Sequence, residues 1–385
     1  MRIIFTGDLS CTGTFQVPVQ SEKEIFSREL LSFLKDADSV ICNFEGAATE
    51  LPNLLRIDCD VRSPKNSIDY FFKRNISGFN LANNHIFDCG VNGFLETRKK
   101  ILETKAIYFG AGQNIVEASK PQYLTHEDLK ICLFGVCHEE GLIARKNKPG
   151  VFCDKSDQVL RDQINEAKKN SDWIILNYHG GEEYTRYPMP KRRQKLVKYL
   201  EYGVDVIVAH HSHVVQGYEK INDKYIFYSL GNFIFDIKQH KNIKFVDKSV
   251  LLRLKFTKDK ITHSFTPILI DVNQSKISLD LNKKNEYEKL SDFTSYNHMW
   301  GKECYRVVCV DDSDNTVCNA LREFKPDAFA NGGDRKQENT PEMDVCNELS
   351  IEMIWNVGGE KIQSSSDLVN NQKRPQDGLW SNTKN

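Results

Sequence analysis

Histidine, carboxylate and amide side chains recur in this sequence directly after short apolar runs. Six of them are of types that bind divalent metal ions: Asp8, Glu45, Asn84, His179, His211 and His213. Any one of these alone is weak evidence, because a lone Asp after Gly more often caps a turn and a lone His is usually hydrogen-bonded or exposed. Together they follow five runs that are typical of buried strands. Ligands collect at the carboxyl ends of such strands, so the six predict a metal site.

The segment His211-Ser212-His213 carries the most weight among these residues. Two imidazoles two positions apart in an extended segment point to the same side, and a metal ion offsets their mutual repulsion. In Asn84-His85, an amide oxygen that can bind metal stands beside a histidine that is free to act as acid or base. The mixed oxygen and nitrogen donors suit Mn, Fe or Zn, and the sequence does not choose among the three.

Other polar residues near these positions could contact a substrate. Glu182, Tyr184 and Arg186 follow His179 closely, and Arg186 would suit a phosphate or carboxylate through two parallel hydrogen bonds. The alternative for Arg186 is an ordinary surface arginine, and both interpretations stay open.

Two further residues could support the histidines. Asp88 and Asn232 could orient histidines, or they could cap a helix and a turn. The capping interpretation is slightly favoured for both.

The elements that must position these residues alternate along the chain. Apolar, β-branched runs predict strands, and amphipathic stretches between them predict helices around residues 21–36, 64–75, 91–104, 156–170 and 190–202. The runs are RIIFTGD, SVICNFEG, ISGFNLANN, KICLFGVC, DWIILNYHG and VDVIVAHHSH. Alternation of this kind indicates a layered α/β fold.

The pattern changes after residue 224. Residues 224–271 predict strands without intervening helices, with the turn of a hairpin at Lys258 and Asp259. Residues 273–298 are polar and predict a linker. A second alternating series follows at 299–370, with strands in YRVVCV, DAFANGG and IEMIWNV and helices near 314–324 and 341–349. Residues 371–385 lack apolar periodicity and predict a disordered tail.

Six segments together resemble the motifs of the CapA family, which is named for the synthesis of bacterial poly-γ-glutamate capsules. They are GDL at Gly7, NFEG at Asn43, LANNHIFDCGVNGF at Leu81, HGGEEY at His179, HHSHVVQG at His210 and YSLGNFIFD at Tyr228. The resemblance covers about residues 1–271, within a domain expected at 1–272, and it implies the calcineurin-like metallophosphoesterase fold. That fold is a four-layer α/β/β/α sandwich with two divalent metal ions between its inner sheets.

The resemblance also implies a role for each motif residue. Glu45 would bridge the two metal ions, and His85 would be the general acid that protonates the leaving group. The remaining ligands would be Asn84, His179 and His211 at one metal ion and Asp8 and His213 at the other.

This sequence departs from the general superfamily at two positions. Ser10 stands where a D-x-H motif has its histidine, so one metal ion loses an imidazole, and Glu45 is one methylene longer than the usual Asp.

The C-terminal series resembles half of a cytidylyltransferase-like nucleotidyltransferase, as a partial Rossmann-like module. The matching nucleotide-binding positions would be Gly332, Gly333, Asp334, Ser364, Ser365 and Ser366. A serine-rich helix N-terminus suits phosphate, although serine there is also a routine cap. The H-x-G-H signature of such enzymes is absent from the sequence, so a complete transferase is not expected.

Composition restricts the partners and the compartment. Lys and Arg (52) nearly balance Asp and Glu (53), and no basic cluster stands out, so nucleic acid is not expected as a partner. Eleven cysteines without a regular framework and a short apolar N-terminus predict a cytoplasmic protein, or one peripheral to the membrane. The expected substrate is a surface polymer or its phosphorylated precursor, with a membrane complex as a second possible partner.

Three functions remain open at this stage. The first is metal-dependent hydrolysis or transfer at a phosphate ester or a γ-glutamyl-type bond. The second is a non-catalytic assembly or regulatory factor of a polymer-synthesis complex, in which the metal ions serve structure. The third is nucleotide binding by the C-terminal module.

Overall fold

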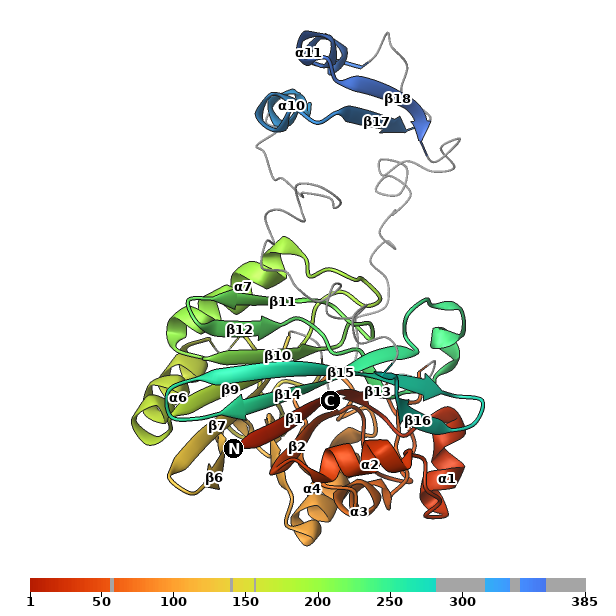
Figure 1. Ribbon diagram of the computed structural model, residues 1–385, viewed down its shortest axis with the longest axis vertical. Coiled ribbons are helices and arrows are strands. Elements are labelled where there is room, and N and C mark those ends of the chain that lie inside the picture. Colours follow the sequence, from red (N-terminus) through yellow and green to blue (C-terminus); the bar gives the residue numbers. More distant parts are fainter. Residues whose placement is uncertain (56–58, 139–140, 156, 282–315, 333–339, 358–385) are drawn as a thin grey trace, which may run out of the picture. The chain divides into compact units, whose positions relative to one another are not determined.

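The computed structural model describes residues 1–55, 59–138, 141–155, 157–281, 316–332 and 340–357. The chain divides into two compact units, Met1–Glu303 and Cys304–Asn385. The first unit contains two large β-sheets with helices packed against them (Figure 1).

The first sheet places the N-terminal strand β1 at its centre. Strand β1 pairs in parallel with β2 and antiparallel with β14, and its end also pairs with the short strand β13. The order across the sheet is β16-β15-β14-β1-β2-β3-β4. The bounds are β1 Arg2–Leu9, β2 Ser39–Phe44, β3 Ile76–Asn80, β4 Ile107–Phe109, β13 Asn232–Ile234, β14 Lys248–Phe256, β15 Ile261–Asp271 and β16 Lys276–Leu279.

The second sheet has the order β11-β12-β10-β9-β7-β6. Its central strands β7, β9, β10 and β12 run parallel, so their carboxyl ends lie at one edge. The bounds are β6 Gln122–His126, β7 Leu129–Cys137, β9 Trp173–His179, β10 Val206–His210, β11 Tyr218–Ile221 and β12 Lys224–Phe227. A separate two-stranded ladder joins β5 (Ala111–Gly112) to β8 (Gly150–Val151).

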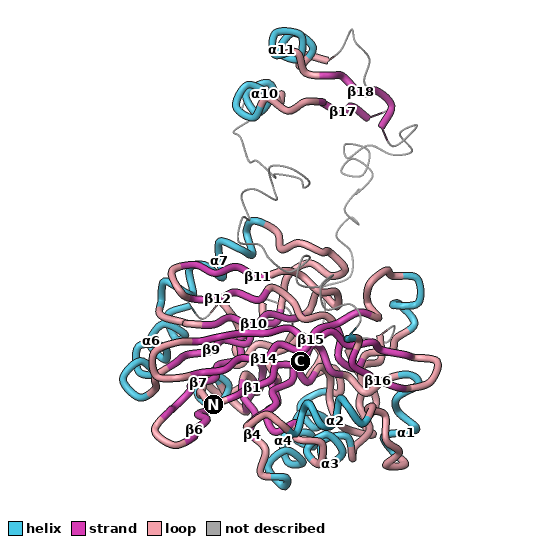
Figure 2. Tube along the Cα trace, in the orientation of Figure 1, coloured by secondary structure: helices cyan, strands magenta, loops and turns pink. Residues whose placement is uncertain are grey.

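The helices form the two outer layers (Figure 2). Helices α1 to α4 pack on the outer face of the first sheet, and α6 and α7 pack on the outer face of the second. The bounds are α1 Gln16–Gln20, α2 Arg28–Lys35, α3 Ser67–Phe72, α4 Gly90–Thr104, α5 Ile115–Ala118, α6 Asp157–Asn170 and α7 Pro190–Tyr202, with short 3₁₀ turns at Gly13–Phe15 and Lys238–Asn242.

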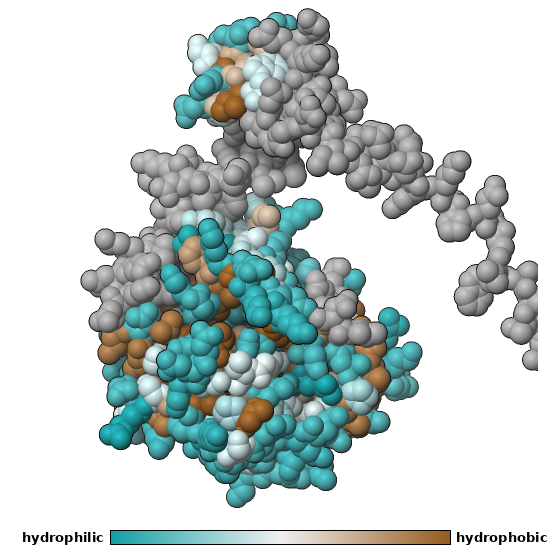
Figure 3. All heavy atoms as spheres, turned by 90° about the vertical axis from the view of Figure 1, so that its right-hand side faces the viewer, coloured by the Kyte–Doolittle hydropathy of each residue, from teal (hydrophilic) through white to brown (hydrophobic). Residues whose placement is uncertain are grey.

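Three apolar cores separate the four layers. The middle core joins the inner faces of both sheets, for example Phe5 and Leu252 of the first with Ile175 and Val208 of the second. Hydrophilic side chains cover most of the face of the first unit shown in Figure 3, with hydrophobic ones in smaller patches between them. The expected four-layer α/β/β/α sandwich is therefore confirmed.

Local sequence explains where the principal helices begin and end. Ser27 caps α2, because its side chain accepts a hydrogen bond from the N–H of Leu30 at 3.2 Å. Helix α7 begins with Pro190, whose fixed φ suits a first helical turn, and Gly203 ends it in the left-handed conformation with φ 116°.

Two of the sequence expectations need correction. The helix expected at 21–36 is confined to Arg28–Lys35, because residues 21–27 form turns and a bridge from Phe26 to Ile277 before the cap. The linker expected at 273–298 begins too early, because β16 pairs with β15 and buries Ile277 completely. A strand of only four residues in a polar segment gives a weak apolar signal.

The second unit is a small α/β arrangement. Strands β17 (Ala328–Gly332) and β18 (Glu352–Val357) pair in parallel, and helices α10 (Cys318–Phe324) and α11 (Met343–Leu349) accompany them. Its apolar contacts include Leu321, Val345 and Cys346. These elements match the strands and helices expected there, whereas the expected strand at YRVVCV and the tail from 371 lie outside the described residues.

Candidate metal centre

The six predicted ligands lie at the carboxyl ends of strands from both sheets. Asp8 is the penultimate residue of β1, Glu45 follows β2 directly, and Asn84 lies in the loop after β3. His179 ends β9, and the loop after β10 carries His211 and His213. All six side chains are buried, with exposures of 0 to 4%. Opposed packing of the two sheets therefore gathers residues that are far apart in sequence.

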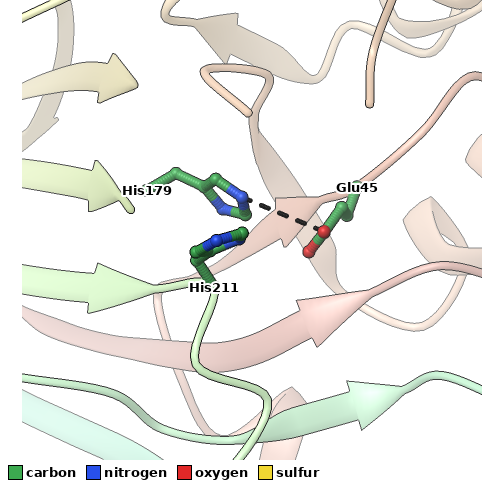
Figure 4. Close-up of side chains that lie close together, drawn as sticks. All are labelled: Glu45, His179 and His211. Carbon is green, nitrogen blue, oxygen red and sulfur yellow. Dashed lines mark ion pairs between the residues drawn. The ribbon is translucent and has the colours of Figure 1, made fainter. Parts of the chain in front are cut away.

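Glu45 stands between two groups of possible ligand atoms. In one group its carboxylate lies near Asp8 and His213, and in the other near His179 and His211, with all ligand atoms of each group within 4.8 Å of one another. Glu45 Oε1 is 3.9 Å from His179 Nε2 and 4.0 Å from His213 Nε2. Figure 4 shows Glu45 facing the imidazoles of His179 and His211.

Asn84 joins the second of these groups through its amide oxygen. Asn84 Oδ1 lies 2.8 Å from His179 Nε2, so both atoms point at the same small volume. His213 Nδ1 lies 3.4 Å from Asp8 Oδ2 on the other side. The structure thus brings together all six residues, and their roles as ligands stay predictions.

The electrostatics of the cluster favour a divalent cation. Burial, together with the neighbouring imidazoles, lowers the pKa of His179 well below its usual value. Burial also lowers the pKa of His211 to about 3. Burial raises the pKa of Asp8, but its contacts with His210 and His213 outweigh that effect and leave the pKa lowered. A divalent metal ion binds imidazoles in their neutral form and carboxylates in their charged form. The residues of this cluster therefore fit a divalent metal ion.

His85 lies beside this cluster, and Asp88 holds its ring. His85 Nδ1 is 2.6 Å from Asp88 Oδ2, and His85 Nε2 is 3.8 Å from Glu45 Oε1. Asn232 Oδ1 likewise lies 2.9 Å from His213 Nδ1. The capping interpretation that the sequence favoured for Asp88 and Asn232 is therefore wrong, because both side chains are used to orient a histidine.

The loop that carries His211 and His213 has an unusual backbone. Their φ angles are 92° and 56°, in the left-handed region that residues other than glycine seldom adopt. The guanidinium of Arg192, which is only 5% exposed, holds this loop from α7. It donates hydrogen bonds to the carbonyl of His210 at 3.3 Å and to Ser212 Oγ at 3.1 Å.

Sequence reasoning missed several neighbours of the cluster. Asn43 Nδ2 donates to Asp8 Oδ1 at 2.9 Å and lies 3.1 Å from His179 Nδ1. His210 Nδ1 lies 3.4 Å from Asp8 Oδ1, and Glu183 Oε1 lies 3.9 Å from His211 Nε2. Asn43 could have been found, because it precedes Glu45 by two positions at the end of a strand.

The three expected substrate contacts separate in the structure. Tyr184 stacks on His213 with ring centroids 5.9 Å apart, which places it at the cluster. The guanidinium of Arg186 lies over the ring of Phe245 at 4.9 Å. Glu182 acts electrostatically on buried Arg192. A role in substrate binding stays a prediction for all three.

The nucleotide-binding prediction for the second unit gains no support. Gly332 ends β17, where it pairs with Val357 of β18. The other matching positions, Gly333, Asp334, Ser364, Ser365 and Ser366, lie outside the described residues.

The fold and the clustered side chains define an α/β sandwich protein with a candidate metal centre. The profile of the family described as bacterial capsule synthesis protein PGA_cap matches residues 2–237. The chain therefore belongs to this family, which confirms the resemblance drawn from its motifs.

Two Bacillus proteins are similar in sequence. The capsule biosynthesis protein CapA of Bacillus anthracis is 28% identical over 289 residues, covering 72% of this chain and 69% of that protein. The PGA biosynthesis protein CapA of Bacillus subtilis is 34% identical over 239 residues, covering 60% of this chain and 62% of that protein. This chain thus spans about two thirds of the length of these relatives.

Two solved structures match part of this chain. A hypothetical protein from Thermus thermophilus is 14% identical and covers 69% of this chain and 98% of its own, with a TM-score of 0.44. A putative 5'-nucleotidase from Staphylococcus aureus is 11% identical and covers 69% of this chain and 53% of its own, also with a TM-score of 0.44.

Among the described residues, the helices are all too short or too polar to cross a membrane.

Proposed function

We propose that this protein is a metal-dependent hydrolase or transferase of surface-polymer biosynthesis. Its substrate would carry a phosphate ester or a γ-glutamyl-type bond, either in the polymer or in a phosphorylated precursor. The observation that supports this most is Glu45, whose carboxylate stands between two groups of buried ligand atoms with His85 beside them. The similarity to capsule and PGA biosynthesis proteins supports the choice of substrate class.

The chain's own residues would hold the metal ions and deliver a proton to the leaving group. Asp8, Glu45, Asn84, His179, His211 and His213 would hold two divalent ions of Mn, Fe or Zn. Such ions, when bound, supply Lewis acidity at the scissile group and help to activate water. His85 would give a proton from Nε2 to the leaving group, while Asp88 holds Nδ1 and so orients the ring.

Hydrolysis by the full chain tests this proposal. We expect protein loaded with Mn, Fe or Zn to cleave p-nitrophenyl phosphate or γ-glutamyl p-nitroanilide. The variant His85→Asn should lower kcat for the anilide about a hundred- to ten-thousandfold, because the anilide nitrogen must be protonated to leave and the variant removes the acid but keeps the metal ligands. Cleavage of p-nitrophenyl phosphate should fall less, because p-nitrophenolate leaves without a proton. Absence of cleavage of both compounds by metal-loaded protein would refute the proposal.

A second candidate function is a non-catalytic role in assembling a polymer-synthesis complex, which could include a membrane partner. A similar protein of Mycobacterium tuberculosis, 27% identical over 170 residues, is described as a probable polyglutamine synthesis accessory protein. Polymer synthesis in cells that is undiminished by His85→Asn would favour this role, because the metal ligands persist in that variant.

A further inference from the structure

Glu183 forms a third group of possible ligand atoms with His211 and His213. All ligand atoms of this group lie within 4.8 Å of one another. Glu183 Oε1 is 3.9 Å from His211 Nε2. Two atoms that bind one ion at about 2.1 Å each are at most about 4.2 Å apart, so the observed distance allows both to bind the same ion.

The two histidines of this group belong to different candidate metal positions. His211 lies in one of the two groups that contain Glu45, and His213 lies in the other. Glu183 therefore approaches one imidazole from each position, as Glu45 does. The two carboxylates differ in exposure, because Glu45 is fully buried and the side chain of Glu183 is 39% exposed. Glu183 thus faces the centre from its solvent side.

The segment between β9 and α7 holds Glu183 against the loop that carries the two histidines. The N–H of the next residue, Tyr184, donates to the carbonyl of Ser212 at 2.9 Å. On the other side, Gly181 has a φ of 115° and packs on Arg192 so closely that a Cβ would lie 2.2 Å from Nη1. The backbone on both sides of Glu183 is therefore fixed, although its side chain is partly exposed.

The hydroxyl of Tyr184 supports the Glu183 carboxylate. Burial, followed by the charge and the hydrogen bond of Glu183, raises the pKa of Tyr184. The hydroxyl therefore stays protonated and donates to the carboxylate. Carboxylates that bind metal ions are commonly oriented by such hydrogen bonds.

The ring of His211 lacks hydrogen bonds that would compensate for its burial. It is only 4% exposed, and its Nδ1 atom has no hydrogen-bond partner among the described residues. Burying an imidazole nitrogen without a partner is costly. A bond from this ring to a metal ion would offset that cost.

Glu183 also changes the balance of donor atoms. The six predicted ligands comprise three imidazoles and three side chains that offer oxygen, and Glu183 would add a fourth oxygen donor. Carboxylate oxygen suits Mn, whereas imidazole nitrogen suits Zn. An additional carboxylate would therefore move the preference of the centre towards Mn.

We propose that Glu183 is a seventh metal ligand, which binds from the solvent side beside His211 and His213 and shifts the preference of the centre from Zn towards Mn. This ligand rests on the proposed function, since it belongs to the same metal centre. Its carboxylate contributes charge and coordination that the buried residues alone do not supply.

Calorimetric titration of the metal-free full chain with Mn²⁺ and, separately, with Zn²⁺ tests this ligand. Glu183→Gln keeps the size of the side chain and removes its charge, so we expect Mn²⁺ to bind at least about tenfold more weakly. Glu183→His offers an imidazole instead, so the ratio of Zn²⁺ affinity to Mn²⁺ affinity should rise at least about tenfold. A merely structural role would leave that ratio unchanged.

Glu201→Gln is the matched control, because Glu201 is an exposed glutamate of α7. It should bind both metal ions as the unchanged protein does. Equal Mn²⁺ binding by the Glu183→Gln and Glu201→Gln proteins, or an unchanged ratio in Glu183→His, would overturn the ligand.

Hydrolysis is measured on the same preparations, so the two proposals fail in different ways. A chain that binds Mn²⁺ through Glu183 but cleaves neither test compound would refute the proposed function and leave the ligand standing. A chain that cleaves them and binds Mn²⁺ equally well with Glu183→Gln would refute the ligand alone.

Discussion

Asp88 and His85 form a hydrogen-bonded pair at the side of the cluster. If His85 is the acid, Asp88 fixes its ring through the contact of 2.6 Å. We expect Asp88→Asn to lower kcat about ten- to a hundredfold while metal content stays unchanged. Hydrolysis assays and elemental analysis of the same preparation measure both quantities.

Asp128→Asn is the control for this variant, because Asp128 lies in the turn between β6 and β7 and its side chain is 80% exposed. It should behave as the unchanged protein. An Asp88→Asn protein with full activity and an unaltered pH profile would show that the pair does not act in the reaction.

The buried histidines predict how stability depends on pH in the metal-free protein. An unfolded histidine gains a proton as pH falls below about 6.5, whereas His211 with a pKa of about 3 does not in the folded state. The unfolded state then binds more protons, so the free energy of unfolding falls by up to about 1.4 kcal/mol per pH unit for each such residue.

Urea unfolding between pH 7 and pH 5 in the presence of a chelator measures this dependence. His211→Asn should show a smaller loss of stability over the same interval, because one of the contributing groups is gone. A free energy of unfolding that is equal at both pH values would contradict the assignment of neutral, buried imidazoles.

Sequence could predict the residues whose spacing repeats a known pattern. Asp8, Glu45 and His179 lie at or directly after strand ends, so the fold brings them together once the topology of its sheets is known. Glu183 and His240 could not be found in this way, because each lies on a loop whose path depends on packing against the cluster. Only the folded arrangement shows their proximity.

At the scale of elements, Arg192 connects helix α7 to the loop after β10. Its guanidinium also donates to the carbonyl of Tyr228 at 3.0 Å, so one side chain holds two loops. We expect Arg192→Met to lower the free energy of unfolding by about 2 to 3 kcal/mol, since buried carbonyls would lose their donor. It should also weaken metal binding, because His211 would no longer be held in its strained conformation.

Chemical denaturation and metal titration measure these two effects, with Lys191→Met as the matched control. Lys191 neighbours Arg192 on α7 but is exposed, so its replacement should change neither quantity. Equal stability of the Arg192 and Lys191 variants would show that the buried guanidinium does not support the loop.

The sequence predicted a helix or strand correctly where its apolar pattern was long. The helices expected at 91–104, 156–170 and 190–202 agree within a residue or so with α4, α6 and α7. Strand β4 has three residues, too few for a period to be recognised. Strand β16 owes its place to pairing with β15, which a local pattern in a polar segment does not reveal.

At the scale of the whole first unit, the centre depends on both sheets. Asp8, Glu45 and Asn84 lie at or after the ends of strands of one sheet, and the three histidines lie at or after the ends of strands of the other. Bound ions would therefore connect the sheets and stabilise the sandwich by mass action. We expect a chelator to lower the Tm of metal-loaded protein by several degrees and added Mn or Zn to restore it.

The layered architecture followed from the alternation of strands and helices together with the family resemblance. The pairing order of the sheets did not, because strands such as β14 and β1 pair across a separation of more than 200 residues.

Asp8→Ala is the variant that tests the expected effect of the chelator on Tm. It should abolish that effect, while a chelator effect that persists in this variant would place the ions elsewhere.

The central claim is that the residues gathered around Glu45 bind two divalent ions. Elemental analysis of the purified full chain, after incubation with Mn, Fe or Zn and removal of free metal, tests it most directly. We predict close to two ions per chain, with a clear loss of metal in Asp8→Ala, Asn84→Ala and His213→Ala. A correctly folded protein that retains no metal after this treatment would contradict the claim.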